Sequence, residues 1–177
     1  MSKLAGRRVL FVIAPRDFRD EELAAPRNAL EAAGARVEVA SPQAEPAVGM
    51  LGARVKPDRL LRECKSDDYD AIVVVGGAGS PAFLWDNPDL HTLLQEAHRA
   101  SKVVAGICLS GAALARAGVL KGVRATVYET KDSLAALTRG GARHVKDDVV
   151  VDGRIVTASG PEAAPAFGNA LVESLAK

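Results

Sequence analysis

The sequence contains only two cysteines and three histidines in 177 residues. Two cysteines do not make a disulfide scaffold, so we expect reduced thiols and a cytoplasmic location. No cluster of cysteine and histidine has the spacing of a structural metal site. We therefore expect neither a metal nor another cofactor.

Charge of one sign and long apolar runs are also lacking. The chain has 23 basic and 22 acidic residues, and this balance argues against nucleic acid or an anionic membrane as the main partner. The longest apolar runs are strand-sized, so no membrane-spanning helix is expected. The basic N-terminus leads into a β-rich run without a small-residue cleavage site, which argues against a signal peptide.

What the sequence does contain is an alternation of strand-sized apolar runs and helix-sized periodic segments. The length and the hydrophobic fraction of 48% suit a single domain over residues 1–177. Continuous apolar strands alternating with helices predict an α/β fold, with a mostly parallel sheet covered by helices on both faces. Asp152-Gly153 predicts a C-terminal β-hairpin. We expect strands at residues 8–14, 36–40, 71–75, 103–107, 149–151 and 154–158, a hairpin or flap at 50–55, and helices at 20–33, 88–100, 110–117, 131–139 and 162–176.

Four segments with candidate functional residues fall where the carboxyl ends of the predicted strands lie. They are residues 16–22, Gly76-Gly77, Cys108 and residues 126–130. In open parallel sheets, binding and catalysis gather in the loops beyond the carboxyl ends of the strands. We therefore expect one site there, although a plain polar loop is the alternative for the first segment.

Cys108 occupies a tight turn between an apolar strand and an alanine-rich helix. A side chain at such a turn is held off the sheet, often with strained backbone angles, at the positive end of the helix. We expect thiolate character at Cys108, N–H groups of Leu109 and Gly77 directed at an oxyanion, and Ser110 as a helix cap. Two alternatives stay open: a small buried hydrophobe, or a phosphate cradle that fits neither common glycine-rich pattern.

Several motifs occur in order along nearly the whole chain. They are Gly76-Gly77 after a valine-rich strand, Ala-Gly-Ile-Cys ending at Cys108, Ala-Gly-Val-Leu-Lys-Gly at 117–122, Lys131-Asp132, Val-Val-Asp-Gly at 150–153 and Ser-Gly-Pro at 159–161. In this combination the chain resembles the PfpI superfamily, which includes the PfpI-type intracellular proteases and the parkinsonism-associated protein deglycase. The resemblance implies a flavodoxin-like three-layer sandwich, a homodimer or higher homo-oligomer, and a reactive Cys108.

The second functional residue of that family is a glutamate on the first helix, four residues before a proline. The spacing matches Glu22, which precedes Pro26, with Glu21 as the neighbouring candidate and a solvated first-turn acid as the alternative. A carboxyl group that touches a thiolate must be protonated to donate a hydrogen bond, because two anions in contact repel. The resemblance therefore implies an ionised Cys108 and a neutral Glu22 that share one proton.

The sequence departs from the family where catalysis is most sensitive. Leu109 stands where the protease-like branch has a histidine, so a Cys-His relay has no evident base. The loop that carries a histidine in the deglycase branch reads Val127-Tyr128-Glu129, which makes Tyr128 and Glu129 candidate substrate contacts. The three histidines match no catalytic position and are expected to be solvated or partly packed: His91, His98 and His144.

Three functions remain as hypotheses. The first is a cysteine-dependent enzyme on small reactive carbonyls, like a glyoxalase III or a deglycase, in which Cys108 attacks an aldehyde and Glu22 moves protons. The second is a non-enzymatic stress or redox-sensing protein with an oxidisable Cys108. The third is a peptidase or amidase, which Leu109 disfavours. For a small-molecule substrate we expect a pocket that includes Gly76, Ser110, Tyr128, Glu129, Arg16, Gly160 and Pro161, with Trp85 at its rim or in an interface.

Overall fold

A mixed seven-stranded sheet forms the middle layer of the structure, a computed structural model that describes residues 2–177. The strand order is β11-β12-β8-β7-β1-β3-β6. Neighbouring strands are parallel except β11 and β12, which form an antiparallel hairpin. The mostly parallel sheet and the C-terminal hairpin are therefore confirmed. The strands are β1 (Arg8–Val12), β3 (Arg36–Ser41), β6 (Arg59–Leu60), β7 (Ala71–Val74), β8 (Val103–Ile107), β11 (Val149–Asp152) and β12 (Ile155–Ala158).

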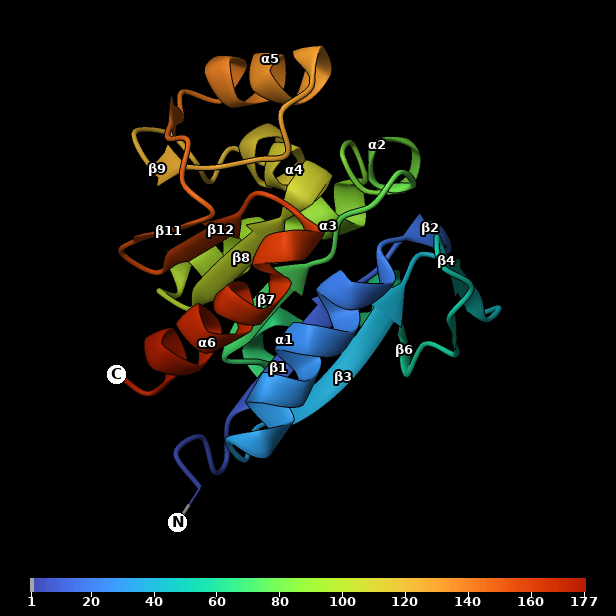
Figure 1. Cartoon of the computed structure of the whole chain (residues 1–177). Helices are drawn as coiled ribbons and strands as arrows, with labels where there is room; N and C mark the ends of the chain where they lie inside the picture. The colour runs from blue at the N-terminus through green and yellow to red at the C-terminus, as the bar shows by residue number, and fades with distance from the viewer. Residues whose placement is uncertain (1) are drawn as a thin grey trace.

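Helices cover both faces of this sheet (Figure 1). On one face, Val9 and Phe11 of β1 pack in a cluster with Phe167 of α6 and with residues of α1. On the other, Leu10 of β1 packs in a cluster with Leu94 of α3 and residues of α4. Adjacent residues of one strand thus serve opposite layers, which explains why the central strands are apolar throughout. The helices are α1 (Asp20–Ala32), α2 (Ser80–Phe83), α3 (Pro88–Arg99), α4 (Gly111–Arg116), α5 (Lys131–Arg139) and α6 (Ala164–Leu175).

The helices α1 and α6 approach each other closely at Gly168. A Cβ atom at Gly168 would lie 2.9 Å from the Cα atom of Pro26. A glycine at this point therefore lets the two backbones come together, and α1 continues through Pro26 to Ala32. The contact holds the N-terminal end of α1, which carries Glu22, beside the carboxyl ends of β1 and β7 (Figure 1).

The segment after β1 differs from the expected plain loop. It forms a short strand, β2 (Arg16–Phe18), which pairs with β4 (Ala47–Gly49), and β4 pairs antiparallel with β5 (Arg54–Val55). The predicted hairpin at residues 50–55 is thus present, but its strands begin earlier and its turn occupies residues 50–53. The remaining short elements are β9 (Arg124–Ala125), β10 (Arg143–His144) and four 3-10 turns at Leu61–Glu63, Ser66–Asp68, Cys108–Ser110 and Pro161–Ala163.

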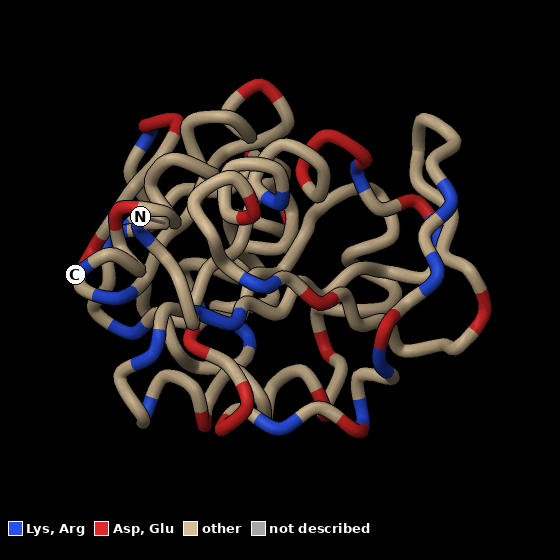
Figure 2. Tube along the Cα trace, turned by 90° about the horizontal axis from the view of Figure 1, so that it is seen from below, with Lys and Arg blue, Asp and Glu red and all other residues tan. Residues whose placement is uncertain are grey.

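Basic and acidic residues alternate over the molecule without a large area of either sign (Figure 2). The two termini lie toward the end of the sheet away from β2 and β4 (Figure 1). Within residues 2–177, no helix has both the length and the apolar character needed to cross a membrane.

Candidate active site

The turn after β8 holds Cys108 in an unusual backbone conformation. Its φ angle is 60°, in the left-handed region that costs a non-glycine residue roughly 1–3 kcal/mol. Such outliers persist where the surrounding structure determines them, and they cluster at functional sites. The strained strand-to-helix turn that the sequence predicts at Cys108 is confirmed.

Hydrogen bonds from Ser110 and Trp85 hold this turn in place. The buried Ser110 hydroxyl lies 2.6 Å from the Val75 carbonyl oxygen and 2.7 Å from the Ser80 hydroxyl. The indole N–H of Trp85 donates to the Leu109 carbonyl oxygen at 2.8 Å. The helix cap predicted at Ser110 is therefore wrong, because its side chain bonds to the neighbouring strand and helix instead of capping α4.

Trp85 was expected at a pocket rim or in an interface, and it does not line the Cys108 pocket. It is 5% exposed, packs in the hydrophobic core and carries the Arg116 guanidinium 5.1 Å from its ring centre. Its role in bracing Leu109 was missed in the sequence. No spacing signal could have found it, because the contact joins two segments 24 positions apart.

Glu22 reaches Cys108 from the first turn of α1. The residue is 0% exposed, and a Cβ atom on Gly76 would lie 2.6 Å from both its Oε1 atom and the Cβ atom of Cys108. Gly76 thus leaves room for the carboxyl and the cysteine to meet over β7. Glu21 is instead half-exposed and pairs with Arg19 at 3.0 Å, so the solvated alternative fits Glu21 and not Glu22.

Burial controls the protonation of both groups. It raises the pKa of Glu22 to about 7, and it raises the pKa of the Cys108 thiol to about 12, with the negative charge of Glu22 adding to the effect. The backbone N–H groups of Gly77 and Leu109 lower the pKa of Cys108, but by less. For Cys108 taken by itself, removal of water outweighs the two donors, so the predicted thiolate depends on the proton that Cys108 shares with Glu22.

The buried Glu22 carboxyl oxygens have almost no hydrogen-bond partners to replace the water that they lose on folding. Neither has a partner of hydrogen-bond geometry among residues 2–177, although the Cys108 thiol and the Gly76 N–H are close enough to lower the carboxyl pKa. A buried acid of this kind costs stability when it ionises. Its retention in the core points to a use other than packing.

We expect Glu22→Gln to stabilise the protein at pH 8 and to leave it nearly unchanged at pH 4. With its pKa raised from 4.5 to about 7, the buried carboxyl and Cys108 as a pair hold their first proton up to about pH 7, so stability falls as pH rises through that window. Glutamine does not titrate, and the difference should approach about 3 kcal/mol above pH 7. Urea unfolding at several pH values measures it.

Glu21→Gln is the matched control for that measurement. The hydrogen bond from Arg19 lowers the pKa of Glu21, so this acid stabilises the fold above its ordinary pKa and loses the effect on acidification. Its variant should show no gain at pH 8. A Glu22→Gln gain that is the same at pH 4 and pH 8 would contradict a buried, titrating carboxyl.

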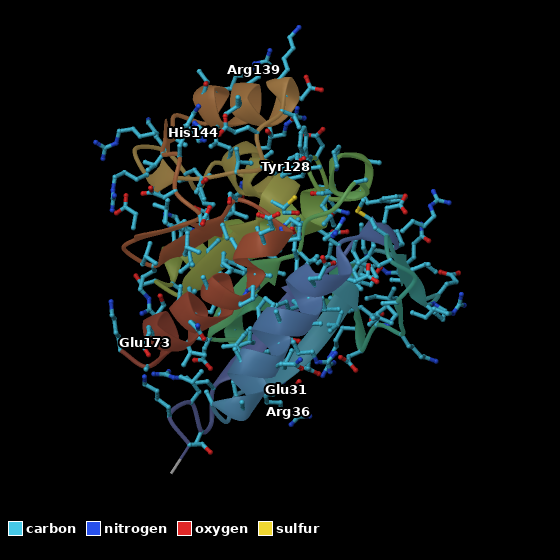
Figure 3. All side chains as sticks on the ribbon, viewed as in Figure 1. Glu31, Arg36, Tyr128, Arg139, His144 and Glu173 are labelled. Atoms are coloured by element: carbon cyan, nitrogen blue, oxygen red, sulfur yellow. The ribbon has the colours of Figure 1, made fainter. Side chains whose placement is uncertain are left out.

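A pocket of about 270 Å³ opens directly above Cys108. All four segments expected to meet at the carboxyl edge line this pocket, and residues 16–22 contribute Arg19 to its wall. Tyr128 lies near this edge of the sheet (Figure 3) and lines the pocket. The lining residues are Arg19, Met50, Gly77, Ala78, Cys108, Leu109, Tyr128 and Pro161.

Several predicted pocket residues lie elsewhere. Arg16 stacks over the Phe83 ring at 5.2 Å and does not line the pocket, so Arg19 takes the place expected for Arg16. Ser110 lies beneath the cysteine. Glu129 and Gly160 line an adjoining hollow of about 510 Å³, which shares Tyr128 and Pro161 with the Cys108 pocket.

Alongside Ala78, Met50 is a pocket residue that the sequence prediction missed. It is 42% exposed and comes from the turn of the β4–β5 hairpin. The only sequence signal was the expected flap at residues 50–55. A larger hollow of about 810 Å³ lies between α1, α6 and the N-terminal segment, but its charged residues Lys3 and Glu173 pair with each other at 2.6 Å.

The histidines do not line the Cys108 pocket. The His91 ring lies 2.7 Å from the Trp85 carbonyl oxygen, His98 is exposed, and His144 lies on β10, apart from Tyr128 (Figure 3). The expected solvated or partly packed positions are confirmed. In the part of the chain that the structure describes, no group of histidine, cysteine or carboxylate side chains is arranged to hold a metal ion.

The chain is similar in sequence to several known proteins. The chain is 44% identical to an uncharacterized protein of Methanocaldococcus jannaschii, over 98% of this chain and 85% of the relative. It is 29% identical to the glutathione-independent glyoxalase DJR-1.2 of Caenorhabditis elegans (97% and 90% covered) and 32% identical to the deglycase PfpI of Pyrococcus furiosus (87% and 90%).

Solved structures show the same fold. A ThiJ/PfpI domain protein from Brachyspira murdochii superposes with a TM-score of 0.90 at 32% identity, covering 96% of this chain and 98% of that one. The predicted flavodoxin-like sandwich is thereby confirmed. The DJ-1/PfpI family matches residues 7–174, and the chain belongs to this family.

Proposed function

We propose that this protein is a cysteine-dependent enzyme that converts small 2-oxoaldehydes to 2-hydroxy acids. Cys108 is the nucleophile and Glu22 moves the protons. The observation that carries the proposal is the fully buried Glu22 carboxyl beside a strained Cys108 at the floor of a small pocket. Glyoxalase and deglycase relatives support this class of reaction.

Cys108 and Glu22 share a single proton above about pH 7 in this proposal. Two groups in contact titrate together, and the pair holds two protons below about pH 7 and one above it. An anion on sulfur accepts hydrogen bonds from the N–H groups of Gly77 and Leu109, whereas an anion on Glu22 has the Gly76 N–H as its one backbone donor. These donors favour the proton on Glu22 and the charge on Cys108.

The chemistry then follows from these positions. The Cys108 thiolate adds to the aldehyde carbon, and a carbon–sulfur bond forms while the aldehyde oxygen becomes an alkoxide. The N–H groups of Gly77 and Leu109 stabilise that charge, and Glu22 donates its proton to give a hemithioacetal.

The second half of the reaction needs a base. The Glu22 carboxylate takes the proton from the former aldehyde carbon and returns it to the neighbouring carbon through an enediol, which leaves a thioester. Water hydrolyses the thioester, releases the 2-hydroxy acid and restores the Cys108 thiol. Glu22 thus performs the proton transfer that the family assigns in part to a histidine.

The pocket favours a small substrate. Its volume of about 270 Å³ holds a short carbonyl compound with few non-hydrogen atoms, and Met50, Leu109 and Pro161 make part of its wall apolar. Tyr128 projects its half-exposed ring at the mouth, where the phenol can bond to a substrate oxygen. These features support a free aldehyde as the substrate rather than a polypeptide segment.

Incubation with methylglyoxal in the presence of EDTA tests the proposal. The protein should consume the aldehyde and form lactate in equal amounts, without added thiol or metal. Disappearance of aldehyde without lactate would mean simple thiol trapping and would contradict an enzyme of this class. Absence of both would contradict reactive-carbonyl chemistry altogether.

A further inference from the structure

Arg19 brings a positive charge to the wall of the Cys108 pocket. Among the described residues that line this pocket, Arg19 alone is basic, and none carries a carboxylate. Its charge acts on the reacting groups, because it lowers the pKa of Glu22 against the larger effect of burial. The pocket therefore holds a cation close to Cys108 and Glu22, and the reaction proposed above gives this cation no role.

The backbone of Arg19 is fixed against the loop that follows β7. Its N–H donates to the Gly76 carbonyl oxygen at 2.9 Å. Gly77 has a φ angle of 110°, and a Cβ atom there would lie 2.5 Å from the Arg19 nitrogen. The turn before Arg19 is held as well, because the Gly79 N–H donates to the Asp17 carbonyl oxygen at 3.0 Å. Arg19 thus keeps a constant position relative to Gly77, whose N–H group stabilises the oxyanion in the proposed reaction.

Glu21 orients the guanidinium group of Arg19. Nε and Nη2 of Arg19 each donate to one carboxylate oxygen of Glu21 at 3.0 Å, and such a fork fixes the plane of the guanidinium. Glu21 itself does not line the pocket, so it holds the cation from outside. Neither bond uses Nη1, whose two N–H groups remain for a ligand.

We propose that Arg19 selects 2-oxoaldehydes that carry a carboxylate at the end away from the aldehyde. This inference rests on the reaction proposed above and names the substrate class for it. A guanidinium forms charge-assisted hydrogen bonds to a carboxylate. Apolar neighbours such as Met50 and Pro161 strengthen that attraction, because they exclude water from it. Methylglyoxal has no group for Arg19 and is therefore the weaker substrate.

The added carboxylate takes no part in the reaction itself. The Cys108 thiolate adds to the aldehyde carbon as it does with methylglyoxal, while Arg19 binds the far end of the molecule. Overall one water molecule is added. The aldehyde carbon is oxidised to a second carboxylate and the neighbouring ketone carbon is reduced to an alcohol, so the product is a 2-hydroxy diacid and no external oxidant or reductant is needed.

Two substrates of similar shape test this selection in Arg19→Gln. The acid is 4,5-dioxopentanoate, and its neutral match is 2-oxohexanal, in which an ethyl group replaces the carboxylate. We expect the ratio of kcat/KM for the acid to that for the neutral aldehyde to fall about tenfold in the variant, mainly through the KM for the acid. General damage to the site cancels in this ratio. An unchanged ratio would overturn the proposal.

Glu21→Gln separates recognition of the acid from the shape of the pocket. This variant removes the ion pair but keeps the charge of Arg19 and an amide oxygen that can accept its hydrogen bond. The ratio should therefore not fall. If it falls as far as in Arg19→Gln, the ion pair only shapes the pocket wall, and Arg19 is not the partner of the acid.

Alkylation of Cys108 by iodoacetamide tests binding without turnover. In a Cys64→Ser background Cys108 is the single cysteine. Glutarate has no reactive carbonyl and should slow alkylation increasingly with its concentration, whereas its diamide should not, and Arg19→Gln should abolish the protection. Equal protection with and without Arg19, or none, would overturn the acid site. Protection that depends on Arg19 in a protein that converts no aldehyde would support the acid site and overturn the reaction alone.

Discussion

Replacement of Cys108 with serine is expected to reduce conversion of methylglyoxal to lactate by at least about a thousandfold. The hydroxyl group is a far weaker nucleophile, and the thioester from which lactate is released no longer forms. The substitution changes the side-chain volume only slightly, and we expect the left-handed backbone at residue 108 to be retained. Circular dichroism should therefore be unchanged while lactate formation, followed by a coupled dehydrogenase assay, is lost.

Cys64→Ser is the matched control. Cys64 is half-buried, and burial raises its pKa to about 11. Its sulfur contacts the Leu60 carbonyl oxygen at 3.5 Å and does not line the Cys108 pocket. The control variant should retain the rate of the unaltered protein. Similar lactate formation by Cys108→Ser and Cys64→Ser would exclude Cys108 as the nucleophile.

Replacement of Gly76 with alanine is expected to damage both fold and site. The added Cβ atom would lie 2.5 Å from the Ile107 carbonyl oxygen and 2.6 Å from the Cβ atom of Cys108. Since backbone atoms cannot move aside cheaply, we expect a loss of about 2–3 kcal/mol in the free energy of unfolding. A shift of Cys108 and Glu22 by about 1 Å should further cost about a hundredfold in turnover.

Gly160→Ala provides the comparison for Gly76→Ala. At Gly160 the nearest atom to an added Cβ is Cδ2 of Tyr128 at 3.4 Å, an ordinary contact, and the φ angle of 167° is extended backbone. This variant should unfold at nearly the same urea concentration as the unaltered protein. If both variants lose stability equally, the tight fit around Gly76 does not explain the effect.

The sequence predicted the sheet well because its strands are buried on both faces. Val103–Ile107 was predicted with its observed bounds, and an apolar run with no polar alternation has few other structures open to it. Short elements were missed because tertiary contacts create them. The strand β2 is defined by its pairing with β4. Three residues are too few to show a periodic pattern, so the sequence could not predict this strand.

The sequence predicted which residues form the site better than it predicted their protonation. Cys108, Gly77, Leu109 and Tyr128 all line the pocket, because a turn after a strand must lie at the carboxyl edge. The effect of burial on the Cys108 pKa was not foreseen, because burial depends on the layers above the turn and not on the turn itself. Arg16 was misplaced because side-chain direction in a three-residue strand cannot be read from spacing.

The shared proton of Cys108 and Glu22 is the central claim, and thiolate absorbance near 240 nm tests it most directly. Measured against pH in a Cys64→Ser background, absorbance lost on alkylation of Cys108 should rise with a midpoint near pH 7, where the pair releases its first proton. The anion is then on sulfur, with the proton kept by Glu22. Absorbance that appears only above about pH 10 would place the anion on Glu22 and contradict the account.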